Sequence, residues 1–217
     1  MTVDARLLQQ LAFCLEVDGA KTIVRHNLLA DGSRRENDAE HMWHLALMAI
    51  VLAEHAAEAV DLARVLSMLV IHDLVEIDAG DTLVYEDAAR ADQAAREAGA
   101  AARIYGMLPA EQGEELRRLW EEFESADTPD ARFARALDRL QPLMLNAAAG
   151  GGAWSEHGIT ADRVAQRNFE PIARGSPALS DAAREIVAGA IAAGILAPVA
   201  SGAPAAGASP AGVSPAG

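Results

Sequence analysis

The chain has 217 residues, of which 51% are hydrophobic and 23% charged, which is ordinary for one globular domain with a sizeable core. Its formal net charge of −14 argues against a broad nucleic-acid-binding surface, because the phosphate backbone would be repelled. Abundant alanine, few β-branched clusters and only 4% aromatic residues favour helices over strands, so we expect an all-α domain.

Cysteine content and the N-terminal sequence bear on the cellular compartment. Cys14 is the single cysteine, which excludes an intrachain disulfide and suits a reducing cytoplasm. The first residues lack the basic start and long apolar run of a signal peptide, and no stretch reaches about 18 uninterrupted apolar residues. We therefore expect a cytoplasmic protein that is neither secreted nor membrane-spanning.

The first part of the chain predicts three helices and one loop. Apolar residues at helical spacing indicate a helix over residues 4–18, and the loop at 19–36 concentrates basic and imidazole groups. A good N-cap at residue 37 or 38 begins a long apolar helix that extends to about residue 56. The next helix is capped by Asp61 and is expected to run unbroken to the Ala79-Gly80 pair.

Five further helices are predicted, over residues 81–108, 111–126, 129–149, 160–173 and 178–195. Pro142 is expected to kink the third of these, and three glycines at 150–152 close it. The last segment, 197–217, mixes Ala, Pro, Gly and Ser without charge and is predicted to be a disordered tail. Residues 1–196 then form the one folded domain.

A histidine and an aspartate interrupt an apolar run in VIHDLVEIDAGD, residues 70–81. His72 and Asp73 are adjacent and point about 100° apart on a regular helix, so both bind one ion only where helices converge. Glu76 lies one turn further, near such an ion yet able to act on a water. Taken alone, the pair is also typical of a hydrogen-bonded core histidine beside an exposed acidic helix end.

Two other predicted helices carry groups of the same kind. His41 and His44 lie three residues apart in a strongly apolar helix, where a buried imidazole needs partners for its nitrogens, so one of them is expected to be a ligand. Asp138 is flanked by core-facing leucines, and a buried carboxylate must be paired or bound to metal. Pairing of Asp138 with Arg135 or Arg139 is the structural alternative.

The order His41, His72-Asp73, Asp138 resembles the H…HD…D signature of the HD-domain metal-dependent phosphohydrolases, an all-helical superfamily. RRENDAEHMWHLALMA, HDLVEIDAGD and FARALDRLQPL are similar to the branch that contains the bacterial 5′-deoxynucleotidases, and the likeness spans residues 5–180. This resemblance implies an HD-domain helical bundle in which these four residues ligate one divalent ion. It also implies that two acidic residues serve the attacking water and the substrate, namely Glu76 and Asp81.

The positions of the histidines indicate which branches of this superfamily the chain does not resemble. HD phosphodiesterases and oxygenases with two metals need extra histidines between the HD pair and the last aspartate, and none occurs there, so a mononuclear site is expected. His55 and His157 are expected to lie away from the ion. His44 is close but one turn off, so it is expected either to support a ligand from behind or to contact the substrate. The metal itself is left open, because such ligands suit cobalt, manganese, zinc and iron.

So many carboxylates would repel the negatively charged phosphate of a substrate, so cationic side chains are needed to bind it. Arg25 is the first candidate for this role and Lys21 the second. Arg34 or Arg35 could equally contact the phosphate, or each could be an ordinary loop arginine in solvent. The expected reaction is hydrolysis of a deoxyribonucleoside 5′-monophosphate to the deoxynucleoside and phosphate. The loop at 18–37 lacks the tryptophan that the resemblance leads us to expect, so another small phosphomonoester, such as a modified nucleotide, is the alternative substrate.

A non-catalytic, metal-bound sensor is the rival function. Intact Glu76 and Asp81 argue against it, because a structural metal site does not require a spare carboxylate beside an open coordination position. A homodimer is a further open question, because the small-residue apolar stripe of residues 181–196 fits either the core or a second subunit.

Overall fold

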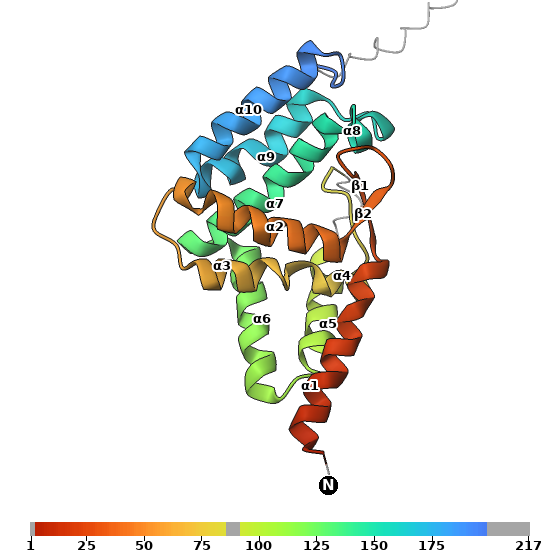
Figure 1. Ribbon diagram of the computed structural model, residues 1–217, viewed down its shortest axis with the longest axis vertical. Coiled ribbons are helices and arrows are strands. Elements are labelled where there is room, and N and C mark those ends of the chain that lie inside the picture. The colour runs from red at the N-terminus through yellow and green to blue at the C-terminus, as the bar shows by residue number, and fades with distance from the viewer. Residues whose placement is uncertain (1–2, 86–91, 199–217) are drawn as a thin grey trace, which may run out of the picture.

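The computed structural model describes residues 3–85 and 92–198, so all but the first two residues of the predicted tail lie outside the described residues. Helices dominate this part of the chain, and its strands form one small two-stranded sheet, which confirms the all-α class (Figure 1). None of the helices described is both long and apolar enough to cross a bilayer.

The N-terminal helix α1, Ala5–Glu16, leads into a 3-10 turn, η1, Val17–Thr22. The segment predicted as a loop then forms an antiparallel hairpin of β1, Val24–Leu28, and β2, Arg35–Asn37, with an irregular register between its ends. The prediction of a loop here is wrong in this respect, because two strands this short are stabilised by packing against neighbouring helices rather than by their own alternation.

Helix α2, Asp38–Leu52, begins where the sequence predicts. The Asn37 side chain accepts a hydrogen bond from the Glu40 backbone N–H, and the Glu40 side chain accepts from the Asn37 backbone N–H. This reciprocal capping box satisfies two amide groups that a helix start leaves unpaired. It fixes the first turn of α2, which carries His41. A short 3-10 turn, η2, Ala53–His55, follows.

The predicted single helix from Asp61 to residue 79 is wrong, because it breaks in its middle. Helix α3, Leu62–Leu69, is capped by Asp61 as expected, but it ends at Val70. A 3-10 turn, η3, His72–Val75, and one turn of α-helix, α4, Glu76–Ala79, complete the segment. A 3-10 turn winds more tightly than an α-helix, so it redirects the chain at the His-Asp pair.

The remaining helices are α5, Gln93–Tyr105; α6, Ala110–Ser125; α7, Pro129–Ala148; α8, Gly152–Glu156; α9, Ala161–Gly175; and α10, Pro177–Ala192. The predicted helix over 81–108 is wrong at its start, since residues 81–85 are not helical and 86–91 lie outside the described residues. Ala197, assigned to the tail, forms a β-bridge with Thr160.

Helix α7 is the centre of the domain, with α9 and α10 on one side and α2, α3 and α6 on the other (Figure 1). Phe133, Leu137, Leu140 and Leu143 of α7 are buried in this core. α7 continues as one helix through Pro142. α10 packs against α7 and α9, and Ala183, Val187 and Ala190 of its apolar stripe are buried in the core of the same chain.

Candidate active site

Three elements bring the four predicted ligands together: α2 with His41, η3 with His72 and Asp73, and α7 with Asp138. His41 Nε2 lies 3.3 Å from Asp138 Oδ1 and 3.7 Å from Asp73 Oδ2. His72 Nε2 lies 3.2 Å from Asp73 Oδ1 and 3.7 Å from Asp138 Oδ1. Ligand atoms of His41, His72 and Asp73 all lie within 4.8 Å of one another, a spacing that fits one metal ion.

Hydrogen bonds at the outer nitrogens orient both imidazoles. His72 Nδ1 donates to the Leu69 carbonyl at 3.0 Å. His41 Nδ1 lies 3.2 Å from Gln141 Oε1, and the Gln141 amide nitrogen donates to Glu36 at 2.7 Å, which turns its oxygen toward His41. With the proton on Nδ1, each Nε2 offers a lone pair to the cluster.

The surroundings of His72 Nε2 show whether an ion fits this site. The atom is buried and has no hydrogen-bond partner among the described residues. A buried polar atom without a partner is costly, and a cation at this point would satisfy it. Two imidazole nitrogens and two carboxylates also make a ligand set that suits first-row divalent ions. The residues present therefore fit the divalent metal that the sequence predicts.

The charges of the cluster favour a cation at its centre. Burial alone would lower the pKa of His72, but the charge of Asp73 and the nearby Asp138 carboxylate raise it to about 10. Burial would raise the pKa of Asp138, but the hydrogen bond from His41, the nearby His72 imidazole and the charge of Arg139 hold it well below its usual range. The carboxylates are thus ionised, and a proton or a metal ion balances them.

Arg25 of β1 is buried against the ligand carboxylates. Its Nη1 lies 2.6 Å from Asp73 Oδ2 and 3.3 Å from Asp38 Oδ1, and its Nε lies 3.9 Å from Glu36 Oε2. The hairpin carries this guanidinium to the cluster, because β1 lies beside the first turn of α2. A cation predicted for phosphate binding therefore lies next to the candidate metal site.

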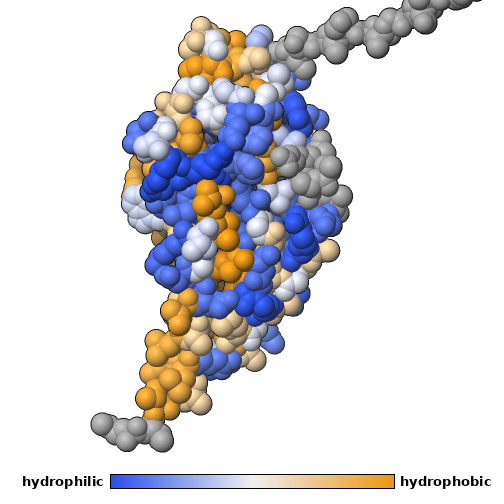
Figure 2. Space-filling view, turned by 90° about the vertical axis from the view of Figure 1, so that its right-hand side faces the viewer, coloured by the Kyte–Doolittle hydropathy of each residue, from blue (hydrophilic) through white to orange (hydrophobic). Residues whose placement is uncertain are grey.

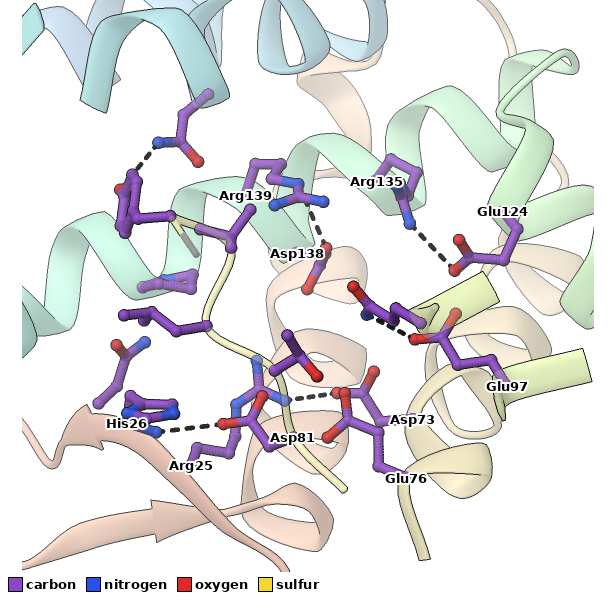
Figure 3. Close-up of a pocket in the computed structure, with 18 of the residues that line it drawn as sticks. Arg25, His26, Asp73, Glu76, Asp81, Glu97, Glu124, Arg135, Asp138 and Arg139 are labelled. Carbon is purple, nitrogen blue, oxygen red and sulfur yellow. Dashed lines mark hydrogen bonds and ion pairs between the residues drawn. The ribbon is translucent and has the colours of Figure 1, made fainter. Parts of the chain in front are cut away.

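Glu76 and Asp81 both line the same cavity as Asp73 and Asp138 (Figure 3). Glu76 is buried, and its Oε2 has no hydrogen-bond partner among the residues described. Burial first, and then the charge of Asp73, raises the pKa of Glu76 well above its usual range. The Asp81 carboxylate accepts a hydrogen bond from the His26 backbone N–H at 3.2 Å.

The cavity has a volume of about 260 Å³ and lies between the hairpin, the segment after α4, and helices α5, α6, α7 and α9. Figure 3 shows the carboxylates of Asp73, Glu76 and Asp81 at one end, with Arg135 and Arg139 entering from α7 on the opposite wall. Its walls also carry His26, Tyr85, Gln93, Glu97, Phe123, Glu124, Asn146 and Asn168. A cavity this polar and this small suits a charged small molecule.

Three predicted substrate contacts lie elsewhere. Lys21 is exposed and pairs with Asp18, and Arg34 is exposed and pairs with Glu40. Neither is among the described residues that line the cavity, because each side chain extends into solvent, where a nearby carboxylate binds it. His44 Nδ1 lies 3.2 Å from the Gln141 amide nitrogen, so it touches the group that orients His41 rather than the cavity.

Sequence reasoning considered Arg139 only as a partner of Asp138 and missed its place in the cavity wall, and it missed Gln141 altogether. Both are on α7, where Arg139 directly follows Asp138 and Gln141 lies one turn further along the helix. Arg139 lines the cavity with its Nε 3.7 Å from Asp138 Oδ2, and Gln141 is fully buried behind His41. For Gln141 the available signal was its position three residues after a candidate ligand on the same helix.

An imidazole pair at the cavity edge was also missed. His26 Nδ1 lies 3.2 Å from His157 Nε2, and the rings meet edge to face. The prediction that His157 lies away from the ion is consistent with this position. Arg35, an alternative phosphate contact in the sequence, instead pairs with Glu156 at 2.6 Å and so connects β2 to α8.

Known proteins are similar to this chain in sequence and in fold. Residues 17–180 match the family model of the HD domain, so the chain belongs to the HD domain family. A solved structure of a predicted metal-dependent phosphohydrolase from Magnetospirillum magnetotacticum MS-1 is 51% identical, with a TM-score of 0.84 over 90% of this chain and all of that one.

Curated relatives share less of their length with this chain. The 5′-deoxynucleotidase HDDC2 of Danio rerio is 28% identical over 109 residues, which is 50% of this chain and 53% of that protein. The 5′-deoxynucleotidase hdd1 of Schizosaccharomyces pombe is 28% identical over 128 residues, or 57% of this chain and 63% of that protein. The chain therefore spans only about half the length of the first of these relatives.

Proposed function

We propose that this protein is a metal-dependent phosphomonoester hydrolase that converts a deoxyribonucleoside 5′-monophosphate to the deoxynucleoside and phosphate. The observation that carries the proposal is one cavity that joins the His-Asp cluster, a buried carboxyl group at Glu76 and a guanidinium at Arg25. The relatives that bear the name 5′-deoxynucleotidase support the substrate class.

In this proposal His41, His72, Asp73 and Asp138 hold one divalent ion, which is manganese, cobalt, iron or zinc. When bound, such an ion polarises a phosphoryl oxygen and lowers the pKa of a coordinated water. The two imidazoles are already oriented by their Nδ1 hydrogen bonds, so little reorganisation accompanies binding.

Glu76 is the residue that orients and deprotonates the attacking water. Its Oε2 atom is buried in the cavity wall without a hydrogen-bond partner among described residues, so it is available to a water. Burial raises the pKa of Glu76, and a cation bound to the neighbouring Asp73 would favour the ionised form of Glu76, which can accept a proton. Asp81 lies further along the same wall, where it contacts the sugar or assists the water.

Arg25 and Arg139 bind the phosphate from two sides. Arg25 exchanges part of its contact with Asp73 and Asp38 for phosphate oxygens once a metal ion neutralises those carboxylates. Arg139 enters from α7 on the opposite wall (Figure 3). Without these cations a phosphate would meet only carboxylates at this end of the cavity.

The exposed, free thiol of Cys14 supports the further proposal that the protein works in a reducing cytoplasm.

The test is phosphate release by metal-stripped protein, supplied with each divalent ion in turn, from a panel of 5′-ribonucleotides, 5′-deoxyribonucleotides and other phosphomonoesters. Glu76→Gln keeps the shape of the side chain and removes the base, and Glu121→Gln, on the exposed face of α6, is the matched control. We expect metal-dependent release from deoxynucleotides that falls by about 100-fold or more in Glu76→Gln and is unchanged in Glu121→Gln.

Two results would change the proposal. Turnover of another phosphomonoester would keep the roles of Glu76 and Arg25 and replace the substrate. Absence of phosphate from every compound, with metal demonstrably bound, would favour the metal-bound sensor.

A further inference from the structure

Carboxylates from three elements, β2, α2 and η3, surround the Arg25 side chain, which is only 12% exposed. Its Nη1 donates hydrogen bonds to Asp73 Oδ2 at 2.6 Å (Figure 3) and to Asp38 Oδ1 at 3.3 Å. Glu36 Oε2 lies 3.9 Å from Nε, which is beyond hydrogen-bond distance. Asp73 and Asp38 are therefore the two acceptors that hold this guanidinium within the described part of the chain.

The first of these acceptors is shared with the candidate metal site. The oxygen of Asp73 that accepts from Arg25 is Oδ2, and the same atom lies 3.7 Å from His41 Nε2. In the proposed function Asp73 is a metal ligand, and its charge is then no longer available to the guanidinium. Asp38 is the acceptor that remains for Arg25.

Asp38 is a fully buried acid at the start of α2. An acid in the first turn of a helix is usual because it favours the helix dipole, but such a side chain is ordinarily in solvent, and Asn37 already caps this helix. The Asp38 backbone N–H donates to the Ile23 carbonyl at 3.2 Å, two residues before Arg25. The capping box and this bond fix the position of Asp38 relative to β1. A buried carboxyl group is costly, so its contact with Arg25 needs a reason beyond the stability of the helix.

We propose that Asp38 is a positioning residue, which holds the Arg25 guanidinium in place for a phosphate group while Asp73 serves the metal ion. The inference rests on the proposed function, because it takes Arg25 as a phosphate-binding group. Asp38 is not among the described residues that line the cavity, so it acts through Arg25 and not on the substrate. Its bond is made to Nη1, which leaves Nη2 of the planar fork for a phosphate oxygen. A guanidinium fixed in this way loses less side-chain entropy when phosphate binds.

The test is the affinity of the manganese-loaded full chain for inorganic phosphate, measured by calorimetry, together with KM and kcat for a phosphomonoester that it hydrolyses. Asp38→Ala removes the acceptor, so the Kd of phosphate and KM should each rise by about 10-fold or more. The value of kcat should fall by less than about 3-fold, because the phosphate contacts Arg25 in the ground state and in the transition state alike. Asp38→Val repeats the test with a side chain of similar volume that offers no acceptor.

Asp38→Asn should behave as the wild type. Burial, and then the charge of Asp73, raises the pKa of Asp38 to about 7, but Oδ1 accepts a hydrogen bond in the protonated and in the ionised form. Asparagine keeps this acceptor at the same place. Rescue by Asp38→Asn would therefore assign the effect to the position of Arg25 and not to the charge of Asp38.

Two further measurements separate positioning from a purely structural role. In an Arg25→Ala background, Asp38→Ala should cause no further loss of phosphate affinity, because Asp38 acts through Arg25. Manganese affinity, from titration of metal-stripped protein, should change by less than about 3-fold, because Asp38 is not a ligand in the proposed site. A distorted first turn of α2 would instead displace His41 and weaken manganese and phosphate binding together.

Each substitution has a matched control. Asp130 also lies in the first turn of a long helix, α7, and accepts a hydrogen bond from a backbone N–H, so Asp130→Ala is the control for Asp38→Ala. Arg6 lies near the N-terminal end of α1, the apolar arm that reaches away from the body of the molecule in Figure 2, and Arg6→Ala is the control for Arg25→Ala. Both controls should leave phosphate affinity unchanged, and circular dichroism of every variant checks the fold.

Four outcomes would overturn the proposal while wild-type protein binds phosphate. These are unchanged phosphate affinity in Asp38→Ala and Asp38→Val, a loss in Asp38→Asn as large as in Asp38→Ala, an equal loss in the Arg25→Ala background, and a parallel loss of manganese affinity. Wild-type protein that binds phosphate but releases it from no compound would count against the proposed reaction alone, since the phosphate affinities of the variants would still decide the role of Asp38.

Discussion

Replacement of Gln141 by leucine should weaken metal binding although Gln141 is not itself a ligand. The residue is fully buried, and its amide group contacts His41 Nδ1 at 3.2 Å, Glu36 at 2.7 Å and His44 Nδ1 at 3.2 Å. Leucine has a similar volume but offers no acceptor to His41 and no donor to Glu36. The imidazole then loses the bond that fixes its tautomer and its orientation.

The size of the effect follows from these contacts. Loss of a group that orients a metal-binding histidine typically reduces metal affinity by about 10- to 100-fold, or about 1.4–2.7 kcal/mol. The buried Glu36 carboxylate also loses its shortest hydrogen bond, and an unsatisfied buried polar group costs about 1–3 kcal/mol of stability, or more when charged. We therefore expect weaker metal binding and a lower melting temperature together.

The assay is a metal titration of chelator-stripped protein by calorimetry, followed by the rate of phosphate release at saturating metal. Gln112→Leu is the control, because Gln112 is only partly buried and bonds to Gln10 on α1. Activity of Gln141→Leu should recover at high metal concentration, since Glu76 and Arg25 are unchanged. Equal metal affinity in Gln141→Leu and the wild type would refute the reasoning, because His41 would then not depend on this bond.

Three further predictions concern stability and phosphate binding. Gly175→Ala should lower the free energy of unfolding by about 1–3 kcal/mol in urea titrations, because the new Cβ would clash with the Arg132 carbonyl oxygen of α7. Gly99→Ala is the control and should leave the free energy of unfolding unchanged, because the space around its Cβ is open. Metal-free protein should lose stability as the pH rises above about 6.5, the pKa of histidine in the unfolded chain. The folded pKa of His72 is about 10, so the stability that its protonation contributes is complete below the unfolded pKa and is lost as the pH approaches the folded pKa. Urea titrations between pH 6 and 9 measure this loss, and an equally steep loss in His72→Gln would assign it to another group. Arg25→Ala should reduce kcat/KM by about 100-fold or more, with part of the loss restored by added guanidinium, and an unchanged kcat/KM would exclude Arg25 from the phosphate site.

Local patterns in the sequence determined the helical class and the identity of the cluster. The Asn37 capping box and the Asp61 cap are interactions within a few residues, so the start of α2 and α3 follows from their own sequence. A histidine or an aspartate in an otherwise apolar helix must be satisfied inside the fold, and this requirement pointed to one of His41 and His44 and to Asp138 before any contact was known. The resemblance to the HD-domain signature then selected His41.

Only the tertiary structure decided how the remaining groups are placed. The break after α3 was not visible, because the apolar spacing of residues 62–79 is continuous. The 3-10 turn at His72 is favoured by its packing against α2 and α5. Among the basic residues of the segment before α2, Arg25 reaches the cluster while Lys21 and Arg34 pair in solvent. Side-chain direction in a hairpin or turn depends on what packs against it, and residues far apart in sequence supply that packing.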